Sequence, residues 1–118
     1  MAKSLTLFLA TTPYGFENTT TAIRLAETAL AKGYKVTLFA SGDGVHNFVR
    51  GQKAQGIPNA EDNFVPLIEK GLRVDLCGTC LRFRGIERGN LMDGAEPSTL
   101  KNLFTIVDEG DVFLSLGL

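Results

Sequence analysis

Short apolar runs of strand length recur along the chain and alternate with stretches of helical periodicity. The first run, SLTLFLA at residues 4–10, is almost continuously apolar, which is typical of a buried strand of a parallel sheet. The second, YKVTLFA at residues 34–40, is rich in β-branched and aromatic residues. Further strands are expected at residues 72–76 and 111–116, with a short one near residues 90–93.

The segments between these strands carry apolar residues three and four positions apart, as amphipathic helices do. One helix is expected to begin near Asn18 and to end at Gly33, and another is expected to begin at a Ser98 cap and to end at Gly110. Two shorter helical segments and one exposed polar loop complete the expected pattern. These are residues 45–52, residues 63–71 and the loop 52–63.

This alternation predicts an α/β fold, in which helices cover both faces of a mainly parallel sheet of four or five strands. The chain has 118 residues and no linker-like stretch, so a single domain over residues 1–118 is expected. Ligands of such open sheets bind beyond the carboxyl ends of the strands. Candidate site residues are therefore sought at those ends.

Charge and hydropathy exclude several classes of partner. Twelve basic and thirteen acidic residues give a net charge of −1, so neither a nucleic-acid partner nor an anionic membrane surface is expected. The apolar runs fall short of the roughly 20 residues that cross a bilayer. The N-terminal run is followed by Thr-Thr-Pro and not by a small-residue cleavage site, so we expect the first strand of a cytoplasmic protein.

Both cysteines, Cys77 and Cys80, lie in LCGTCLRFRG at residues 76–85, where the third strand passes into a helix. His46 is the sole histidine and there is no second Cys-x-x-Cys, so neither a zinc site nor another cofactor is expected. A reducing compartment also disfavours a structural disulfide. Three interpretations of the pair stay open: two core thiols, a redox dithiol, or a nucleophilic thiol.

The position of Cys77 favours the nucleophilic interpretation. At the start of a helix, unpaired backbone N–H groups and the helix dipole favour a thiolate, as would an arginine of the RFR triplet at residues 82–84. Gly78 lets the backbone approach a bound anion or a partner sulfur closely. Cys80, in the first helical turn, is the thiol that better fits a core role, facing inward toward Leu76.

Other residues near this edge of the sheet have weaker claims. His46 follows the SGDG turn and could exchange a proton with a substrate, although a solvated side chain is the simpler alternative. Gly42 and Gly44 of that turn match only part of a phosphate-loop fingerprint. The hydroxyl-rich run at residues 11–21 fits either an anion site or a helix cap. The candidate catalytic residues are Cys77 and Cys80, and the candidate substrate-binding residues are Gly78, Thr79, Arg84 and His46.

The cysteine segment resembles a motif of the DsrE/DsrF-like family of sulfur-relay proteins, which includes TusD-like subunits. In that motif a cysteine lies eight residues before the glycine of an Arg-Gly-hydrophobic triplet, a spacing that Cys77 and Gly85 keep. Residues 10–47 are similar to the first βαβ unit of the family, and residues 98–118 are similar to its closing helix and strand. The resemblance therefore covers nearly the whole chain.

The resemblance implies a Rossmann-like or flavodoxin-like three-layer sandwich that assembles into homotrimers or homohexamers. It also implies sulfurtransferase chemistry, with sulfane sulfur carried as a persulfide on Cys77 between donor and acceptor proteins. Cys80 departs from the family, which usually has a small apolar residue there. This second thiol leaves open a thiol-disulfide oxidoreductase, and a non-catalytic oligomeric binding module is the other alternative.

Overall fold

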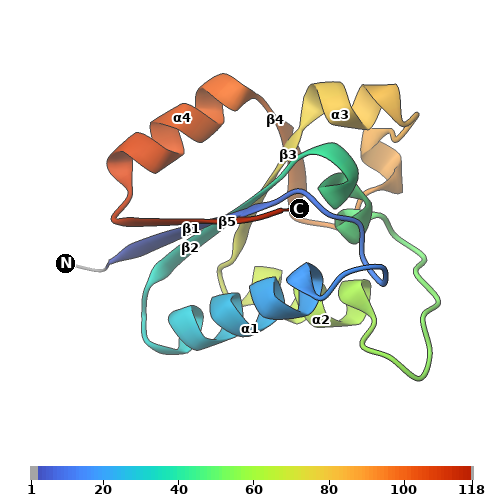
Figure 1. Cartoon of the computed structure of the whole chain (residues 1–118), viewed down its shortest axis with the longest axis horizontal. Helices are drawn as coiled ribbons and strands as arrows, with labels where there is room; N and C mark the ends of the chain where they lie inside the picture. Colours follow the sequence, from blue (N-terminus) through green and yellow to red (C-terminus); the bar gives the residue numbers. More distant parts are fainter. Residues whose placement is uncertain (1–2, 118) are drawn as a thin grey trace.

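The computed structural model describes residues 3–117, and within them five parallel strands form one sheet with helices on both faces (Figure 1). The strands lie in the spatial order β4–β3–β2–β1–β5. Their bounds are β1 Ser4–Leu9, β2 Lys35–Ala40, β3 Arg73–Cys77, β4 Ala95–Ser98 and β5 Val112–Leu116. The predicted α/β sandwich with a parallel sheet is confirmed, and β1 lies in its interior, between β2 and β5.

Two helices cover each face of the sheet. Helices α1 and α2 lie on one face, and α3 and α4 lie on the other, above the sheet in the view of Figure 1. Their bounds are α1 Asn18–Ala31, α2 Ala60–Glu69, α3 Gly78–Phe83 and α4 Leu100–Glu109, with 3₁₀ segments η1 Gly42–Phe48 and η2 Arg88–Asn90. The expected start of α1 at Asn18 is confirmed, and the chain leaves this helix through Gly33, whose φ is +81°.

The main hydrophobic core lies between the sheet and the face covered by α1 and α2. Leu7 and Leu9 of β1 are fully buried there against Ala22 and Ala26 of α1. The other face has a smaller apolar cluster, in which Phe39 is fully buried and shares its packing with Leu103 of α4. The sheet is therefore firmly covered on one side and more sparsely covered on the side that carries α3 and α4.

The structure corrects two expected elements near the end of the chain. The strand expected near residues 90–93 is wrong: Leu91 makes only an isolated bridge with Val49, and the fourth strand is β4. The cap of α4 is Thr99, whose hydroxyl accepts the Asn102 N–H at 3.1 Å, and not Ser98. The sequence AEPS of β4 has little strand propensity, so this strand is defined by its pairing with β3.

A buried carboxylate ties β3, β4 and α4 together. Asp75 of β3 is 5% exposed and accepts two hydrogen bonds from the Arg73 guanidinium, at 3.0 and 3.2 Å. It also accepts hydrogen bonds from the Ser98 hydroxyl at 3.2 Å and the Asn102 amide at 3.3 Å. A buried charge is tolerated when it is paired in this way. The carboxyl ends of β3 and β4 are thus fixed relative to the start of α4.

Among the residues the structure describes, no helix is both long and apolar enough to cross a membrane.

Candidate functional site

The two cysteines lie where β3 passes into α3, and they share one open pocket. Cys77 is the last residue of β3 and the N-cap of α3, and Cys80 lies in the first turn of that helix. Both line a pocket of about 390 Å³. Its other lining residues are Ser41, Gly78, Thr79, Arg82, Ser98, Thr99 and Leu100. The expected strand-to-helix position of the pair is confirmed.

The burial of the two thiols is the opposite of the sequence expectation. Cys77 is 6% exposed and packs in the small cluster with Phe39 and Leu103. Cys80 is the more accessible thiol, partly exposed at the side of the pocket. The reason is geometric, because Cys77 ends a strand whose face is covered by α4, whereas Cys80 is turned toward the loop that follows β2.

Two groups from the segment that follows β2 hydrogen-bond to the sulfur of Cys80. The backbone N–H of Gly42 donates to Cys80 Sγ at 3.2 Å, and the Ser41 hydroxyl lies 3.6 Å from the same atom. Sulfur is a weak acceptor as a thiol and a much better one as a thiolate, so this arrangement favours the anion.

Opposing effects act on the pKa of Cys80, and their balance lowers it. Burial raises the pKa, because desolvation penalises the charged form. The hydrogen bonds from Ser41 and Gly42 lower it, as does the neighbouring Cys77 side chain, and the positive charge of Arg84 lowers it further. The lowering effects outweigh burial, so the pKa of Cys80 lies below that of an ordinary thiol.

A tight glycine turn brings these donors to Cys80. Gly42 has a φ of +55°, and a Cβ on Gly44 would lie 2.1 Å from the carbonyl oxygen of Leu9. The turn can therefore lie directly on the end of β1 only if position 44 is glycine. Sequence reasoning matched these glycines to a fragment of a phosphate loop and missed their N–H donor to Cys80. The available signal was the order of the strands in the sequence, because consecutive strands of a parallel sheet are usually neighbours. The segments that follow β2 and β3 therefore meet at the same edge.

Arg84 connects the end of α3 to the same turn. Its guanidinium donates to the Asp43 carboxylate at 2.8 and 3.1 Å and to the Cys80 carbonyl at 3.1 Å. Arg84 thus lies next to the cysteine pair, as the sequence suggested, but its charge acts on Cys80. Asp43, which sequence reasoning did not select, neutralises part of that charge and holds the guanidinium in place.

Two of the remaining candidate residues, Gly78 and Thr79, line the cysteine pocket, and His46 is not among its lining residues. Gly78 lines the pocket, and a Cβ there would lie 3.2 Å from the Ser98 carbonyl, so glycine allows β4 to come close to the start of α3. Thr79 also lines the pocket, and its hydroxyl accepts a hydrogen bond from Arg82 at 3.2 Å. Within residues 3–117, His46 lies in η1 and is not among the residues that line the pocket.

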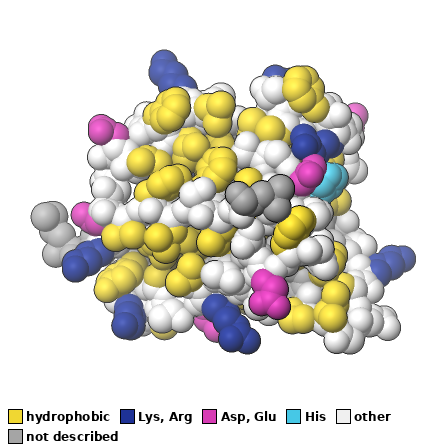
Figure 2. All heavy atoms as spheres, viewed as in Figure 1, with side chains coloured by type: hydrophobic (Ala, Val, Ile, Leu, Met, Phe, Trp, Pro, Cys, Tyr) yellow, Lys and Arg dark blue, Asp and Glu magenta, His cyan; other side chains and the backbone are white. Residues whose placement is uncertain are grey.

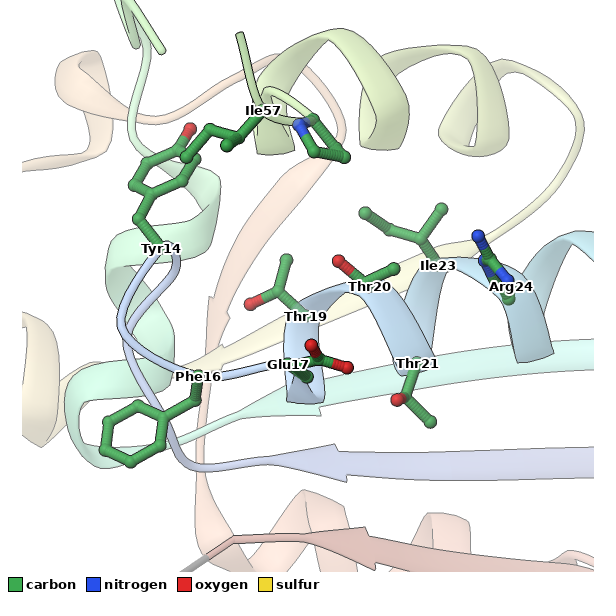
Figure 3. A pocket seen from close by; sticks show the side chains of 10 residues that line it. Tyr14, Phe16, Glu17, Thr19, Thr20, Thr21, Ile23, Arg24 and Ile57 are labelled. Atoms are coloured by element: carbon green, nitrogen blue, oxygen red, sulfur yellow. The ribbon is translucent and has the colours of Figure 1, made fainter. Parts of the chain in front are cut away.

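A second pocket, of about 470 Å³, lies at the start of α1 (Figure 3). Tyr14 and Ile57 face Thr19 and Thr20 across it, and Phe16 points away. The hydroxyl of Thr19 is used internally, because it donates to the Asn47 side chain at 2.5 Å. Thr19 of the hydroxyl-rich run at residues 11–21 therefore has a structural role, and the expected helix cap is not formed, because Glu17, the N-cap of α1, makes no capping side-chain hydrogen bond.

No metal centre is formed by the described part of the chain. Over residues 3–117, no three His, Cys, Asp or Glu side chains come together in a way that could hold a metal ion. The thiols of Cys77 and Cys80 are both free. The pocket thus presents two free thiols, and the pKa of one of them, Cys80, is lowered.

The chain is similar to known proteins over most of its length. The model of the DsrE/DsrF-like family matches residues 3–116. An uncharacterised protein of Methanopyrus kandleri is 36% identical over 107 residues, which are 91% of this chain and 88% of that protein. The protein YchN of Escherichia coli is 34% identical over 93 residues, which are 77% of this chain and 80% of YchN.

Solved structures show the same architecture. The crystal structure of Escherichia coli YchN superposes with a TM-score of 0.92 at 30% identity, covering 98% of this chain and all of that one (100%). A protein of unknown function from Methanobacterium thermoautotrophicum has the same fold, with a TM-score of 0.81 at 15% identity over 97% of this chain and 99% of that one. The resemblance seen in the cysteine segment is thus confirmed over nearly the whole sequence, and the chain belongs to the DsrE/DsrF-like family.

Proposed function

We propose that this protein carries sulfane sulfur as a persulfide on its cysteine pair, accepting the sulfur from a donor protein and giving it to an acceptor thiol. The observation that supports this most is the shared pocket of two free thiols in which Cys80 Sγ accepts the Gly42 N–H at 3.2 Å. The thiolate is the form of cysteine that attacks sulfur, and persulfide exchange follows the same rules as disulfide exchange. The proposed chemistry requires no cofactor.

Within the pair, we propose Cys77 as the residue that holds the persulfide. Its spacing to Gly85 matches the family motif, and at 6% exposure a persulfide there would be shielded from reductants in bulk solvent. Gly78 and Thr79 line the pocket and are proposed to contact the incoming sulfur group. Arg84 is proposed to act indirectly, because its positive charge lowers the pKa of Cys80. No role is proposed for His46, which is not among the residues that line the pocket.

The test is the intact mass of the protein after incubation with a small persulfide donor such as glutathione persulfide. Wild type should gain the mass of one sulfur atom and lose it again on treatment with a thiol reductant. The double variant Cys77→Ser/Cys80→Ser should gain none. If wild type gained no sulfur under conditions that load a known persulfide carrier, sulfur carriage would be excluded.

A second candidate function is thiol-disulfide exchange, and one observation favours it. Cys77 and Cys80 line the same pocket and are both free thiols, so the two sulfurs already face one space before any reaction. In this case a partner disulfide would be reduced to two thiols, and wild type would lose two hydrogen atoms to an internal Cys77–Cys80 disulfide and would not hold sulfur. If neither thiol reacted, the pocket would belong to a non-catalytic binding module.

We further propose that residues 1–118 act as one DsrE/DsrF-like domain in the cytoplasm. The family match over residues 3–116 supports the first part. The two free thiols support the second, because the cytoplasm keeps thiols reduced and persulfide exchange needs them in that state.

We also propose that the chain acts as a homotrimer or homohexamer. Strand β5 is at the edge of the sheet, and its residues from Val112 to Ser115 are exposed, although most of them are large and apolar. We call the residues Leu100, Phe104, Val112, Phe113 and Leu114, contributed by α4 and β5, the apolar face. Figure 2 shows hydrophobic side chains gathered over these two elements.

A second copy of the chain is the proposed occupant of the apolar face. An unpaired apolar edge strand is a liability in a monomer, because it exposes hydrogen-bonding groups and hydrophobic area together. A family that assembles from identical subunits would cover this edge on every copy.

A further inference from the structure

The two thiols of the pocket differ in access and in hydrogen bonding, and this difference assigns them an order. On the basis of the sulfur carriage proposed above, we propose that Cys80 takes the sulfur from the donor and passes it to Cys77, which stores it. The acceptor of the first step is thus a residue outside the family motif, and the motif cysteine receives the sulfur second.

Access supports this order. An incoming persulfide is attached to another molecule, and its outer sulfur must reach the attacking sulfur in line with the bond that breaks. Cys77 is 6% exposed and is covered by Phe39 and Leu103, whereas Cys80 is partly exposed at the pocket wall. A donor can therefore approach Cys80 without any movement of α4.

The hydrogen bonds support the same order. Cys80 Sγ accepts the Gly42 N–H at 3.2 Å and lies 3.6 Å from the Ser41 hydroxyl. The Asp43–Arg84 ion pair, at 2.8 Å, joins this turn to α3 and keeps the donors aimed at the sulfur. These groups stabilise negative charge on Cys80 in the resting state and whenever the residue leaves as a thiolate.

The first step is a balanced exchange with a donor persulfide, R–S–SH. The Cys80 thiolate attacks the outer sulfur, the S–S bond of the donor breaks, and R–S⁻ leaves with the electron pair. The products are Cys80–S–SH and R–S⁻, and R–S⁻ takes up the proton of the Cys77 thiol. No outside oxidant or reductant is needed, because the sulfane sulfur only changes its partner.

The second step moves the sulfur inward. The Cys77 thiolate attacks the outer sulfur of Cys80–S–SH, the S–S bond breaks, and Cys80 leaves as a thiolate, so the product is Cys77–S–SH. A thiol of lower pKa leaves faster, and the hydrogen bonds from Gly42 and Ser41 make Cys80 such a leaving group. The same contacts that prepare Cys80 for attack therefore drive the transfer to Cys77.

The order is tested by time-resolved loading with substoichiometric glutathione persulfide, followed by alkylation and mass spectrometry. Trypsin releases both cysteines in one peptide, residues 74–82, and fragmentation between them locates the added sulfur. In wild type the sulfur should appear on Cys80 first and then on Cys77. Its appearance on Cys77 first would overturn the proposal.

Single variants give the matched comparison. Cys77→Ser should still load and should hold the sulfur on Cys80, whereas Cys80→Ser should load about tenfold or more slowly than wild type, because its remaining thiol is buried and lacks the Gly42 donor. Equal loading rates of Cys80→Ser and wild type would refute the order while leaving sulfur carriage intact. No loading of wild type would refute both.

A further measurement uses the wild-type protein, so its result does not depend on whether a variant folds correctly. One equivalent of iodoacetamide at mildly acidic pH should alkylate Cys80 and leave Cys77 free, because Cys80 is the more accessible thiol, accepts the Gly42 N–H and has a pKa below that of an ordinary thiol. The singly alkylated protein should then fail to load at the wild-type rate. Preferential alkylation of Cys77, or unimpaired loading after Cys80 is blocked, would overturn the assignment.

Discussion

At the scale of single residues, the charge of Arg84 and the hydroxyl of Ser41 tune the thiol of Cys80. Both lower the pKa of Cys80, so Arg84→Gln and Ser41→Ala should each raise it. The thiolate would then form only at higher pH, and alkylation at a fixed, mildly acidic pH would slow down. The measurement is the pH profile of Cys80 alkylation in a Cys77→Ser background.

Asp43 provides a control for the sign of this effect. Asp43→Asn removes the negative charge 2.8 Å from the guanidinium but keeps a side chain of the same shape. If charge is the main contribution of Arg84, this variant should lower the pKa of Cys80, opposite to Arg84→Gln. A profile that stays unchanged in both variants would mean that the Arg84–Asp43 pair only ties the turn to α3.

Gly85 is a residue whose role depends on backbone conformation alone. It follows α3 with a φ of +67°, and no atom beyond its two chain neighbours lies within 4 Å of where its Cβ would be. Gly85→Ala should therefore cost about 1 kcal/mol of unfolding free energy through backbone strain. Chemical denaturation measures this cost.

The matched control is Gly89→Ala. The position is equally open, since nothing lies within 4 Å of its Cβ, but its φ is not in the left-handed region. This substitution should change the unfolding free energy by less than about 0.5 kcal/mol. Equal losses in the two variants would argue against strain at position 85.

At the scale of elements, the first turn of η1, which follows β2, depends on Gly44. A Cβ at this position would lie 2.1 Å from the Leu9 carbonyl oxygen and 2.8 Å from its carbon, and backbone atoms cannot move aside cheaply. Gly44→Ala should destabilise the protein by about 1–3 kcal/mol or more. It should also slow Cys80 alkylation, because the Gly42 N–H would shift away from the sulfur.

Gly15→Ala is the control for this prediction. It lies in the loop after β1, where an added Cβ would meet only Thr12 Cγ2, at an ordinary 3.6 Å. Thermal unfolding of both variants, together with alkylation of Cys80, separates a local effect on the turn from a general loss of stability. Gly44→Ala with wild-type stability would contradict the close packing of the turn on β1.

The elements that the sequence predicted well are those with strong local signals. The apolar run of β1, the β-branched run of β2 and the glycine that ends α1 each specify their own structure, and all three are confirmed. Strand β4 was misplaced because Ala95, Pro97 and Ser98 have no strand propensity and are extended only through pairing with β3. A strand that forms through pairing with its neighbour need not have strand propensity in its own sequence.

The position of the cysteine pair was predicted from the sequence, but the burial and the hydrogen bonds of the two thiols were not, for a related reason. That Cys77 and Cys80 lie at a strand-to-helix junction follows from local pattern. Which of them is buried depends on α4, about 25 residues away, whose Leu103 covers the end of β3. The Gly42 donor also reaches Cys80 through tertiary structure, because it depends on the parallel pairing of β2 with β3. The spacing of residues along the sequence predicts neither the burial of Cys77 nor the Gly42 hydrogen bond to Cys80.

At the scale of the whole molecule, the apolar face formed by α4 and β5 is the feature that a monomer explains least. Phe104 is 71% exposed and Phe113 is 43% exposed, on a sheet edge that no other part of residues 3–117 covers. Leu100 belongs to this face and also lines the cysteine pocket, so an assembly built on the face would bring a second copy close to the thiols. Oligomerisation and access to Cys80 are therefore expected to be linked.

Light scattering at micromolar concentration should give wild type the mass of a trimer or hexamer. Phe104→Asp places a charge on the apolar face without removing a buried side chain, and the assembly should dissociate toward monomer because burying an unpaired carboxylate is costly. Ile57→Asp is the control, since Ile57 is 54% exposed but lies in the loop before α2, and it should keep the wild-type mass. A monomeric wild type, or dissociation caused equally by both variants, would show that the apolar face does not bind a second copy.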